Sequence, residues 1–261
     1  MSRLPRAAVC ASSFVAAVAL QTATPGIAAA EGANGLGDKH SLILSVDRLI
    51  PVLSYSSQTV TTTANNISLK TTDSGTSTAI FFGREPSLGI VHTVPRIAFD
   101  YAIIDHLTLG CALAFAIGLG GSHSEDLPNG VTRKDDSGKT SVIGFAPRVG
   151  YVIPFGNLFA FWPRAGFAFY SVSTSIPSVG PNNTPVTTTN SDSVYSLDLD
   201  PQFAWVPMHN FFVHFGPLIN IPIGGSRSVE VKTGNRSDTT DNGLSVFHFG
   251  LSAGLGGWFD L

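Results

Sequence analysis

Apolar and polar residues alternate along three stretches of the chain that share one layout and begin at Pro95, Pro147 and Pro201. Each stretch contains an alternating segment, a turn of a few residues, a second alternating segment and a long polar segment. Alternation with a period of two indicates a β-strand whose two faces meet different surroundings. Because the layout recurs along the chain, we predict one all-β domain built from repeated strand–turn–strand units.

The same alternation, followed along the rest of the chain, predicts eight strands at Ser41–Tyr55, Val91–Ile103, Leu107–Leu119, Ser141–Ile153, Leu158–Val172, Ser193–Val206, Phe211–Ile223 and Leu244–Phe259. Short turns are predicted at Ile104–His106, Phe155–Asn157 and Pro207–Asn210. Four long polar loops are predicted at Ser56–Ile90, Gly120–Thr140, Thr174–Asp192 and Gly224–Gly243. Strands joined alternately by short turns and long loops are typical of an antiparallel up-and-down barrel, with the long loops at one end.

Large apolar residues occupy one face of these strands, while small residues and isolated charges occupy the other. In Leu107–Leu119, for example, Leu113 and Phe115 alternate with Ala112 and Ala114. A soluble barrel would turn the large apolar face inward and the charged face toward water. Here the small and charged face suits a narrow filled lumen and the apolar face suits hydrocarbon, so we predict an eight-stranded antiparallel up-and-down transmembrane β-barrel.

Aromatic residues are frequent near the predicted short turns and are interpreted as a girdle at the membrane surface: Tyr101, Tyr151, Phe155, Phe159, Trp205, Phe211, Trp258 and Phe259. The chain as a whole resembles the OmpA-like family of eight-stranded outer-membrane proteins. That resemblance implies the outer membrane of a Gram-negative bacterium, with the short turns on the periplasmic side. It also implies assembly by the barrel assembly machinery, which reads an aromatic C-terminal strand. The sequence departs from this signal, because it ends in Leu261 with Phe259 two positions earlier.

The first thirty residues are interpreted as a signal peptide. Arg3 and Arg6 provide the positive start, Ala7–Leu20 the apolar core, and Ala28–Ala30 the cleavage site. The domain would then comprise residues 31–261, with 13 basic and 18 acidic side chains, so nucleic acid is not an expected partner. Removal of the signal would also leave Cys111 without a disulfide partner.

The inward face carries charged and polar residues of both signs: Arg96, Asp100, Arg148, Arg164, Asp198, Asp200, Gln202, His214 and His248. An eight-stranded barrel has an interior wide enough only for side chains. We therefore expect these residues to form a salt-bridge network that fills the lumen, and a gated ion path is the alternative.

An enzymatic interpretation would combine His248 and Ser252, both inward on the last strand, with Asp198 or Asp200 as the acid of a hydrolase triad. Some small outer-membrane barrels modify lipid A, and one group of them resembles this chain in carrying a His and a Ser close together. Here the two are four residues apart and no acid is fixed by spacing, so we predict that the protein is not an enzyme. A lipid-modifying hydrolase or acyltransferase is the first alternative, and a soluble lipocalin-like barrel the second.

No cofactor or metal is expected, because the loop acids Asp126, Asp135, Asp136, Asp238 and Asp241 lack the spacing of a calcium loop. The expected partners are outer-membrane lipid and an extracellular partner of the loops whose identity the sequence does not indicate. Five prolines fall inside predicted strands: Pro95, Pro147, Pro163, Pro201 and Pro217. Each removes a hydrogen bond, so the strands either contain bulges there or end early and leave the barrel partly open.

Overall fold

The computed structural model describes residues 35–64, 67–78, 92, 94–118, 121–126, 132–179 and 184–261. These residues form β1 (Ser41–Ala64), β2 (Ile67–Thr78), β3 (Arg96–Ile104), β4 (Leu107–Ile117), β5 (Gly121–Asp126), β6 (Thr132–Ser137), β7 (Lys139–Tyr151), β8 (Ile153–Phe155), β9 (Phe159–Val179), β10 (Pro185–Met208), β11 (Phe211–Thr233) and β12 (Arg236–Asp260). They all lie in one compact unit, Glu31–Leu261. The predicted signal peptide lies outside the described residues and stays a prediction. No helix in the described ranges is long and apolar enough to span a membrane.

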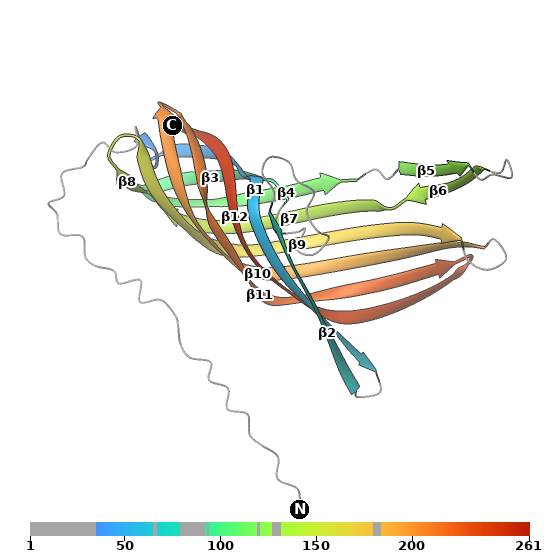
Figure 1. Ribbon diagram of the computed structural model, residues 1–261. Helices are drawn as coiled ribbons and strands as arrows, with labels where there is room; N and C mark the ends of the chain where they lie inside the picture. The colour runs from blue at the N-terminus through green and yellow to red at the C-terminus, as the bar shows by residue number, and fades with distance from the viewer. Residues whose placement is uncertain are drawn as a thin grey trace, which may run out of the picture. The chain divides into compact units, whose positions relative to one another are not determined.

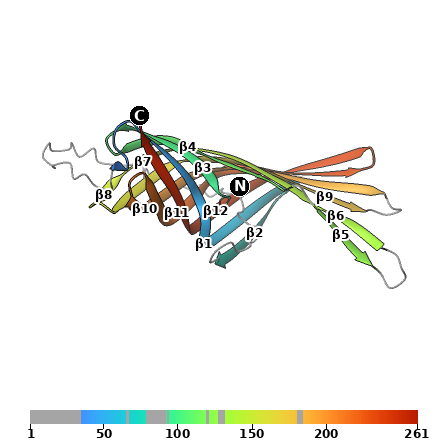
Figure 2. The same ribbon diagram turned by 90° about the horizontal axis from the view of Figure 1, so that it is seen from above.

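Eight antiparallel strands form a closed ring in the order β1, β3, β4, β7, β9, β10, β11 and β12, with β12 paired to β1 (Figures 1 and 2). The prediction of an all-β antiparallel barrel is therefore confirmed. The sheet has ten strands rather than eight. The first extra strand, β8, pairs with β9 just after β7 ends, and the second, β2, pairs with β1 outside the ring. The β5–β6 hairpin forms a separate two-stranded sheet.

Burial alternates along each strand of the ring, as β7 illustrates. From Val142 to Gly150, even-numbered residues are buried, while the odd-numbered Ile143 and Phe145 are 69% and 49% exposed. Inward positions are small where a large side chain from a neighbouring strand needs the space. A Cβ at Gly144 would meet the ring of Tyr170, and one at Gly150 would meet Trp162. The small inward face thus accommodates the few aromatic side chains that fill the lumen.

The lumen contains two apolar clusters separated by polar residues. One cluster lies toward the short turns and comprises Leu36, Ile43, Val152, Ala160, Trp162, Ala204, Val206, Phe212 and Trp258. We call it the floor cluster. The other lies toward the long strand extensions and comprises Val94, Ala98, Ala112, Ala114, Val142, Ala146, Ala168, Tyr170, Val172, Val194, Leu244 and Val246. We call it the upper cluster. On β10 the inward Asp198, Asp200 and Gln202 lie between Val194 above and Ala204 below, so a polar layer is enclosed at both ends.

The predicted long loops are wrong over much of their described length, because strands continue into them. β1 runs to Ala64 and is followed by β2, β9 runs to Val179, and β11 runs to Thr233. These segments are rich in threonine and serine, and hydroxyls bond across the strands, as between Thr59 and Thr72 at 3.0 Å. Threonine is β-branched and favours strands. Their polarity is typical of loops, but these segments are strands whose residues are polar and at least partly exposed on both faces.

The ladder is interrupted beside the prolines, which remain within the strands. Pro163 and Pro201 lie opposite each other in the β9–β10 ladder. Pro147 is paired with Cys111 on β4, but on its other side the β7–β9 pairing is interrupted between Phe145 and Arg148. Between Leu199 and Phe203 the β10–β11 pairing is interrupted in the same way, where Pro201 and Pro217 face each other. Proline has no N–H to donate. Each of these prolines is therefore paired with the neighbouring strand on one side, while the pairing on its other side is interrupted.

The alternative that the prolines end the strands is therefore wrong for Pro147, Pro163, Pro201 and Pro217. Pro95 lies just before β3, which starts at Arg96 rather than at the predicted Val91. The residues His92 and Val94 are fully or almost fully buried, at 0% and 8% exposure.

Gly166 allows β7 and β9 to approach closely where their pairing is interrupted. A Cβ at Gly166 would overlap the carbonyl oxygen of Pro147, whereas one at Gly224 on β11 would meet nothing. We expect Gly166→Ala to lower the free energy of unfolding by about 1–3 kcal/mol through overpacking. Gly224→Ala should change it by less than about 0.5 kcal/mol. Urea unfolding of the two variants in the same detergent measures both, and equal effects would contradict the close approach.

Candidate functional site

The polar layer of the lumen contains four arginines and four aspartates, each at most 8% exposed: Arg48, Arg96, Arg148, Arg164, Asp47, Asp100, Asp198 and Asp200. They come from five strands of the ring, β1, β3, β7, β9 and β10. Asn220 of β11 adds a polar neighbour that donates a hydrogen bond to Asp198. Buried charges are tolerated only where they are paired and hydrogen-bonded. Each of these eight groups has at least one oppositely charged partner in the layer.

Asp47 organises one half of the layer. Its Oδ1 accepts a hydrogen bond from Arg164 Nη1 at 3.1 Å, and its Oδ2 accepts one from Arg148 Nη1. Arg148 Nε also donates to Asp100 Oδ1 at 2.9 Å, and Arg164 Nη2 donates to Asp200 Oδ2 at 2.6 Å. Two arginines and three aspartates from five strands are thereby joined across the lumen.

Asp198 organises the other half. Its Oδ2 accepts hydrogen bonds from Arg96 Nη1 at 2.9 Å and from Arg48 Nη2 at 3.3 Å. Its Oδ1 accepts from the Ser196 hydroxyl at 2.9 Å and from the Asn220 amide. Arg48 Nη1 also donates to the backbone carbonyl of His92, which ties that residue to the interior.

Asp47 and Arg48 are consecutive in β1, yet both side chains are buried at 2% exposure. Regular strand geometry allows only one of two neighbours to face inward. Arg48 adopts φ 58°, in the left-handed region, and the β1–β12 register shifts between Val46 and Ile50. This bulge turns a second charged side chain into the lumen, a local irregularity of the kind often found at constrained sites.

All nine residues expected in the lumen are buried there, at 8% exposure or less: Arg96, Asp100, Arg148, Arg164, Asp198, Asp200, Gln202, His214 and His248. The structure brings them into contact through the two aspartate centres. Gln202 Nε2 donates to Asp200, and its Oε1 lies 3.1 Å from His214 Nδ1.

Asp47 and Arg48 are not among the residues expected from the sequence. Asp47 keeps the odd-numbered inward alternation of Ser41, Ile43 and Ser45, so alternation is an available signal for it, whereas Arg48 faces inward only because of the bulge. The buried Asn220 is also absent from the expected set, although its even-numbered position on β11 places it on the same inward face as His214.

The predicted catalytic combination of His248 and Ser252 is not assembled. Both side chains face inward, at 1% and 5% exposure, but His248 has other partners. Its Nε2 lies 2.8 Å from the Ser54 hydroxyl and its Nδ1 lies 3.1 Å from Asn220 Oδ1.

The direction of these hydrogen bonds follows from Asn220, whose amide nitrogen donates to Asp198. Its Oδ1 can therefore only accept, so His248 carries hydrogen on Nδ1 and Ser54 donates to Nε2. A Ser–His–Asn chain has the polarity of a nucleophilic triad. However, Ser54 is 4% exposed and Asn220 is 0% exposed, so a substrate has no access to the hydroxyl without movement of the wall.

The aromatic residues expected in the girdle divide into seven outward residues and one inward residue. Tyr101 and Phe211 are partly exposed, and five others are between 44% and 55% exposed: Tyr151, Phe155, Phe159, Trp205 and Phe259. The assignment of Trp258 is wrong. It is 0% exposed and packs against Phe212 in the floor cluster, with ring centroids 6.3 Å apart. Trp258 is an even-numbered residue of β12 and shares the inward face with His248. Its position in the alternation therefore indicates the lumen, although its nearness to the short turns suggests the girdle.

One ion pair lies above the upper cluster, beyond the apolar band. Arg227 Nε and Nη2 donate to the two carboxylate oxygens of Asp192 at 2.7 and 2.6 Å. The hydrogen bond to Asp192 raises the pKa of Arg227 above its ordinary value. Among the described residues there is no cluster of His, Cys, Asp or Glu suited to a metal ion, and Cys111 is a free thiol.

Comparisons with known proteins yield structural likeness only. No protein-family model and no curated protein matches the sequence. The chain is similar to the outer membrane protease OmpT from Escherichia coli, at 9% identity and a TM-score of 0.38, over 84% of this chain and 97% of that one. It is similar to Ail, the attachment invasion locus protein of Yersinia pestis, at 12% identity and a TM-score of 0.34, over 85% and 99%. A deltaS2 mutant of the TodX monoaromatic hydrocarbon channel matches at 8% identity and a TM-score of 0.27, over 87% and 93%.

All three TM-scores are below 0.5, so no property is transferred from these proteins. Function is therefore inferred from the barrel itself.

Proposed function

We propose that this chain is an integral outer-membrane β-barrel protein without enzymatic activity, acting structurally or through surface interactions of its polar strand extensions and the connections between them. One observation carries the proposal: the closed ring turns its large apolar residues outward. Phe115, Ile143 and Phe167 are 71%, 69% and 62% exposed, each on a different strand. A closed ring leaves no strand edge with unpaired backbone N–H and C=O groups, which lipid could not hydrogen-bond. An apolar outer face is suited to contact with acyl chains.

The contents of the lumen argue against the soluble lipocalin-like alternative. Such a barrel binds an apolar ligand in an apolar interior and turns polar residues toward water. Here the interior holds eight paired charges between two packed clusters, and the apolar residues lie outside. Transfer of this outer face to water would leave an exposed apolar surface far larger than soluble monomers carry.

The two apolar clusters also argue against a gated ion path. The floor cluster includes the large side chains Trp162, Phe212 and Trp258, all 0% exposed, and the upper cluster includes Tyr170 at 1%. An ion would have to cross both clusters and break paired charges between them, at the high cost of an unpaired charge in an apolar environment. A structural filling is the simpler role for the network.

The Ser54–His248–Asn220 chain is the observation that favours a second candidate, a lipid hydrolase. Its geometry provides an oriented nucleophile, but its burial removes substrate access. We interpret the chain as structural, since the three side chains satisfy one another's hydrogen bonds and connect β1, β11 and β12. In this interpretation, outer-membrane lipid contacts the outer face of the barrel and is not a substrate.

The eight-stranded ring supports a relationship to the OmpA-like family as part of the proposal. We further propose export by the signal peptide at residues 1–30 and insertion by the barrel assembly machinery, with β12 and its outward Phe259 as the recognised strand. The destination is the outer membrane of a Gram-negative bacterium.

Membrane fractionation and electrophoresis with and without boiling test the location and the fold together. The mature protein is expected in the outer-membrane fraction, and the unheated form is expected to migrate differently from the boiled one. A detergent-free soluble pool would overturn the membrane assignment. For the second candidate, Ser54→Ala is compared with Ser252→Ala in cells assayed for lipid turnover. An unchanged lipid profile in both supports the non-enzymatic role, and loss of turnover in Ser54→Ala alone would establish a hydrolase.

A further inference from the structure

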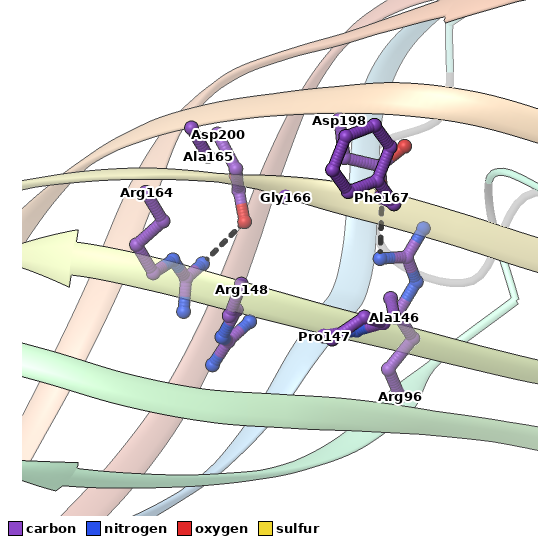
Figure 3. Close-up of a pocket in the computed structure, with 10 residues that line it drawn as sticks. All are labelled: Arg96, Ala146, Pro147, Arg148, Arg164, Ala165, Gly166, Phe167, Asp198 and Asp200. Atoms are coloured by element: carbon purple, nitrogen blue, oxygen red, sulfur yellow. Dashed lines mark hydrogen bonds and ion pairs between the residues drawn. The ribbon is translucent and has the colours of Figure 1, made fainter. Parts of the chain in front are cut away.

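A small cavity lies in the wall of the barrel where Pro147 interrupts the β7–β9 pairing. It measures about 10 Å³, which is the space of one water-sized particle. Charged side chains of the lumen line it on one side: Arg96, Arg148, Arg164, Asp198 and Asp200. Figure 3 shows Arg164 reaching toward Asp200 and Arg96 toward Asp198 around this space. The cavity therefore adjoins both halves of the charged layer.

One backbone carbonyl at this cavity lacks its donor in the ladder. In the β7–β9 register Pro147 lies opposite Phe167, which also lines the cavity. The carbonyl oxygen of Pro147 faces β9, because a Cβ at Gly166 would overlap it. In an antiparallel pair the nitrogen of a residue points to the same neighbouring strand as its carbonyl, and the proline nitrogen carries no hydrogen. The Phe167 carbonyl therefore has no backbone N–H opposite it.

The other interruption of the wall shows how such a carbonyl is served from inside the barrel. Pro201 and Pro217 face each other between β10 and β11, and neither has an N–H to donate. The side-chain amide of Gln202 donates to the Pro217 carbonyl, with Nε2 and the oxygen 3.3 Å apart. A polar side chain of the lumen thus replaces a missing hydrogen bond of the ladder. At the cavity, the three lining arginines donate to aspartates instead.

The cavity also adjoins guanidinium groups that lack an acceptor. Arg96 Nε and Nη2 and Arg164 Nε are buried without a hydrogen-bond partner among the described residues. Asp200 has acceptor capacity left, because each of its oxygens accepts one hydrogen bond, from Arg164 and from Gln202. An occupant of the cavity is therefore required both to accept hydrogen bonds from arginine and to donate them to a carbonyl and a carboxylate.

We propose that this cavity is a binding site for one water molecule, which donates to the Phe167 carbonyl and to Asp200 and accepts from Arg96 and Arg164. Water is neutral, has two hydrogens and two lone pairs, and fits the volume. An anion has no hydrogen for the carbonyl and is repelled by the two aspartates that line the cavity. A metal cation has no lone pair for the guanidinium groups and is repelled by the arginines.

The bound water has two structural roles. It takes the place of the N–H that Pro147 lacks, as the Gln202 amide does at Pro217. It also joins the two halves of the charged layer, because Arg96 donates to Asp198 while Arg164 donates to Asp47. The first role rests on the proposed membrane location, since lipid offers the Phe167 carbonyl no hydrogen bond from outside.

Crystals of the wild-type protein grown in sodium bromide identify the occupant without any variant. One spherical density peak is expected within hydrogen-bond distance of the Phe167 carbonyl oxygen and of a guanidinium nitrogen, with no anomalous signal from bromide. An anomalous peak in the cavity, or a cavity without density, would overturn the proposal. This result depends on the folded lumen alone, so it is distinguishable from a failure of the membrane assignment in fractionation.

A set of variants tests whether the water replaces the missing N–H. Ala146 lines the cavity and lies opposite Ala112 of β4, which does not line it. Both are inward alanines, 4% and 0% exposed, so Ala146→Val and Ala112→Val add the same two methyl groups and only the first displaces the water. Pro147→Ala restores the N–H opposite Phe167 and is added to each of the two.

Thermal unfolding in one detergent measures the effect of Pro147→Ala in both backgrounds. The restored N–H serves a carbonyl that has lost its water only in Ala146→Val. Pro147→Ala is therefore expected to change the unfolding midpoint at least about 2 °C more favourably in Ala146→Val than in Ala112→Val. An equal change in the two backgrounds would mean that no water serves the Phe167 carbonyl, and the proposal would be wrong.

Discussion

Replacement of Asp47 by asparagine is expected to lower the free energy of unfolding by about 3–5 kcal/mol, the cost of leaving a buried charge without its partner. Asp47 lies within hydrogen-bond or ion-pair distance of Arg148, Arg164 and His214. Asparagine keeps the size of the side chain but removes its negative charge, and its amide nitrogen turns one acceptor into a donor. Of the eight charged groups of the layer, four arginines and three aspartates would then remain, which is one positive charge in excess. Urea unfolding and refolding in detergent measures the change.

Asp238→Asn is the matched control. Asp238 pairs with Arg236 at 3.2 Å, but the two side chains are 68% and 79% exposed. An exposed ion pair contributes little, so the same chemical change should alter stability by less than about 0.5 kcal/mol. If Asp47→Asn were as mild as Asp238→Asn, the lumen would have to be hydrated and the network would not be the structural centre of the barrel.

The sequence predicts the wall and most of the lumen because alternation is a geometric property of strands. Arg148, Arg164 and Asp200 are found by parity alone, since neighbouring residues of a strand face opposite sides. Asp100, a partner of Arg148, is found in the same way, but Arg48 is not. Asp47 and Arg48 lie together inside only because Arg48 adopts a left-handed backbone conformation within a bulge. No single-residue pattern in β1 indicates that irregularity.

The structure differs from the expectations from sequence in two other places, and each difference has its own cause. The strand extensions resemble loops in sequence because their threonine- and serine-rich segments lack an apolar face, although β-branched threonine forms strands well. In the candidate site, His248 was correctly placed inside, but its partner Ser54 comes from β1 across the barrel seam. Register between strands distant in sequence depends on the bulges in β1, so local spacing on β12 pointed to Ser252 instead.

Replacement of Phe215 by lysine is the second change expected to lower the free energy of unfolding strongly, because the apolar face of the wall points outward. This residue is 50% exposed in the outward band of β11, beside Phe203 with ring centroids 5.9 Å apart. In a membrane, a lysine there should lower the free energy of unfolding by about 2–4 kcal/mol, the cost of a charge near the centre of the bilayer. In water the same change at an exposed position would alter it by about 0.5 kcal/mol or less.

Two controls separate the charge from the loss of the ring and from depth. Phe215→Leu removes the aromatic contact and keeps an apolar side chain, so the difference between the lysine and leucine variants reports the charge. Phe259→Lys places the same charge at the end of β12, beside the short turns, where the cost should fall to about 0–1 kcal/mol. Unfolding in lipid vesicles measures all three variants. Because only a bilayer makes the penalty depend on depth, equal costs at Phe215 and Phe259 would mean that the apolar face does not meet lipid.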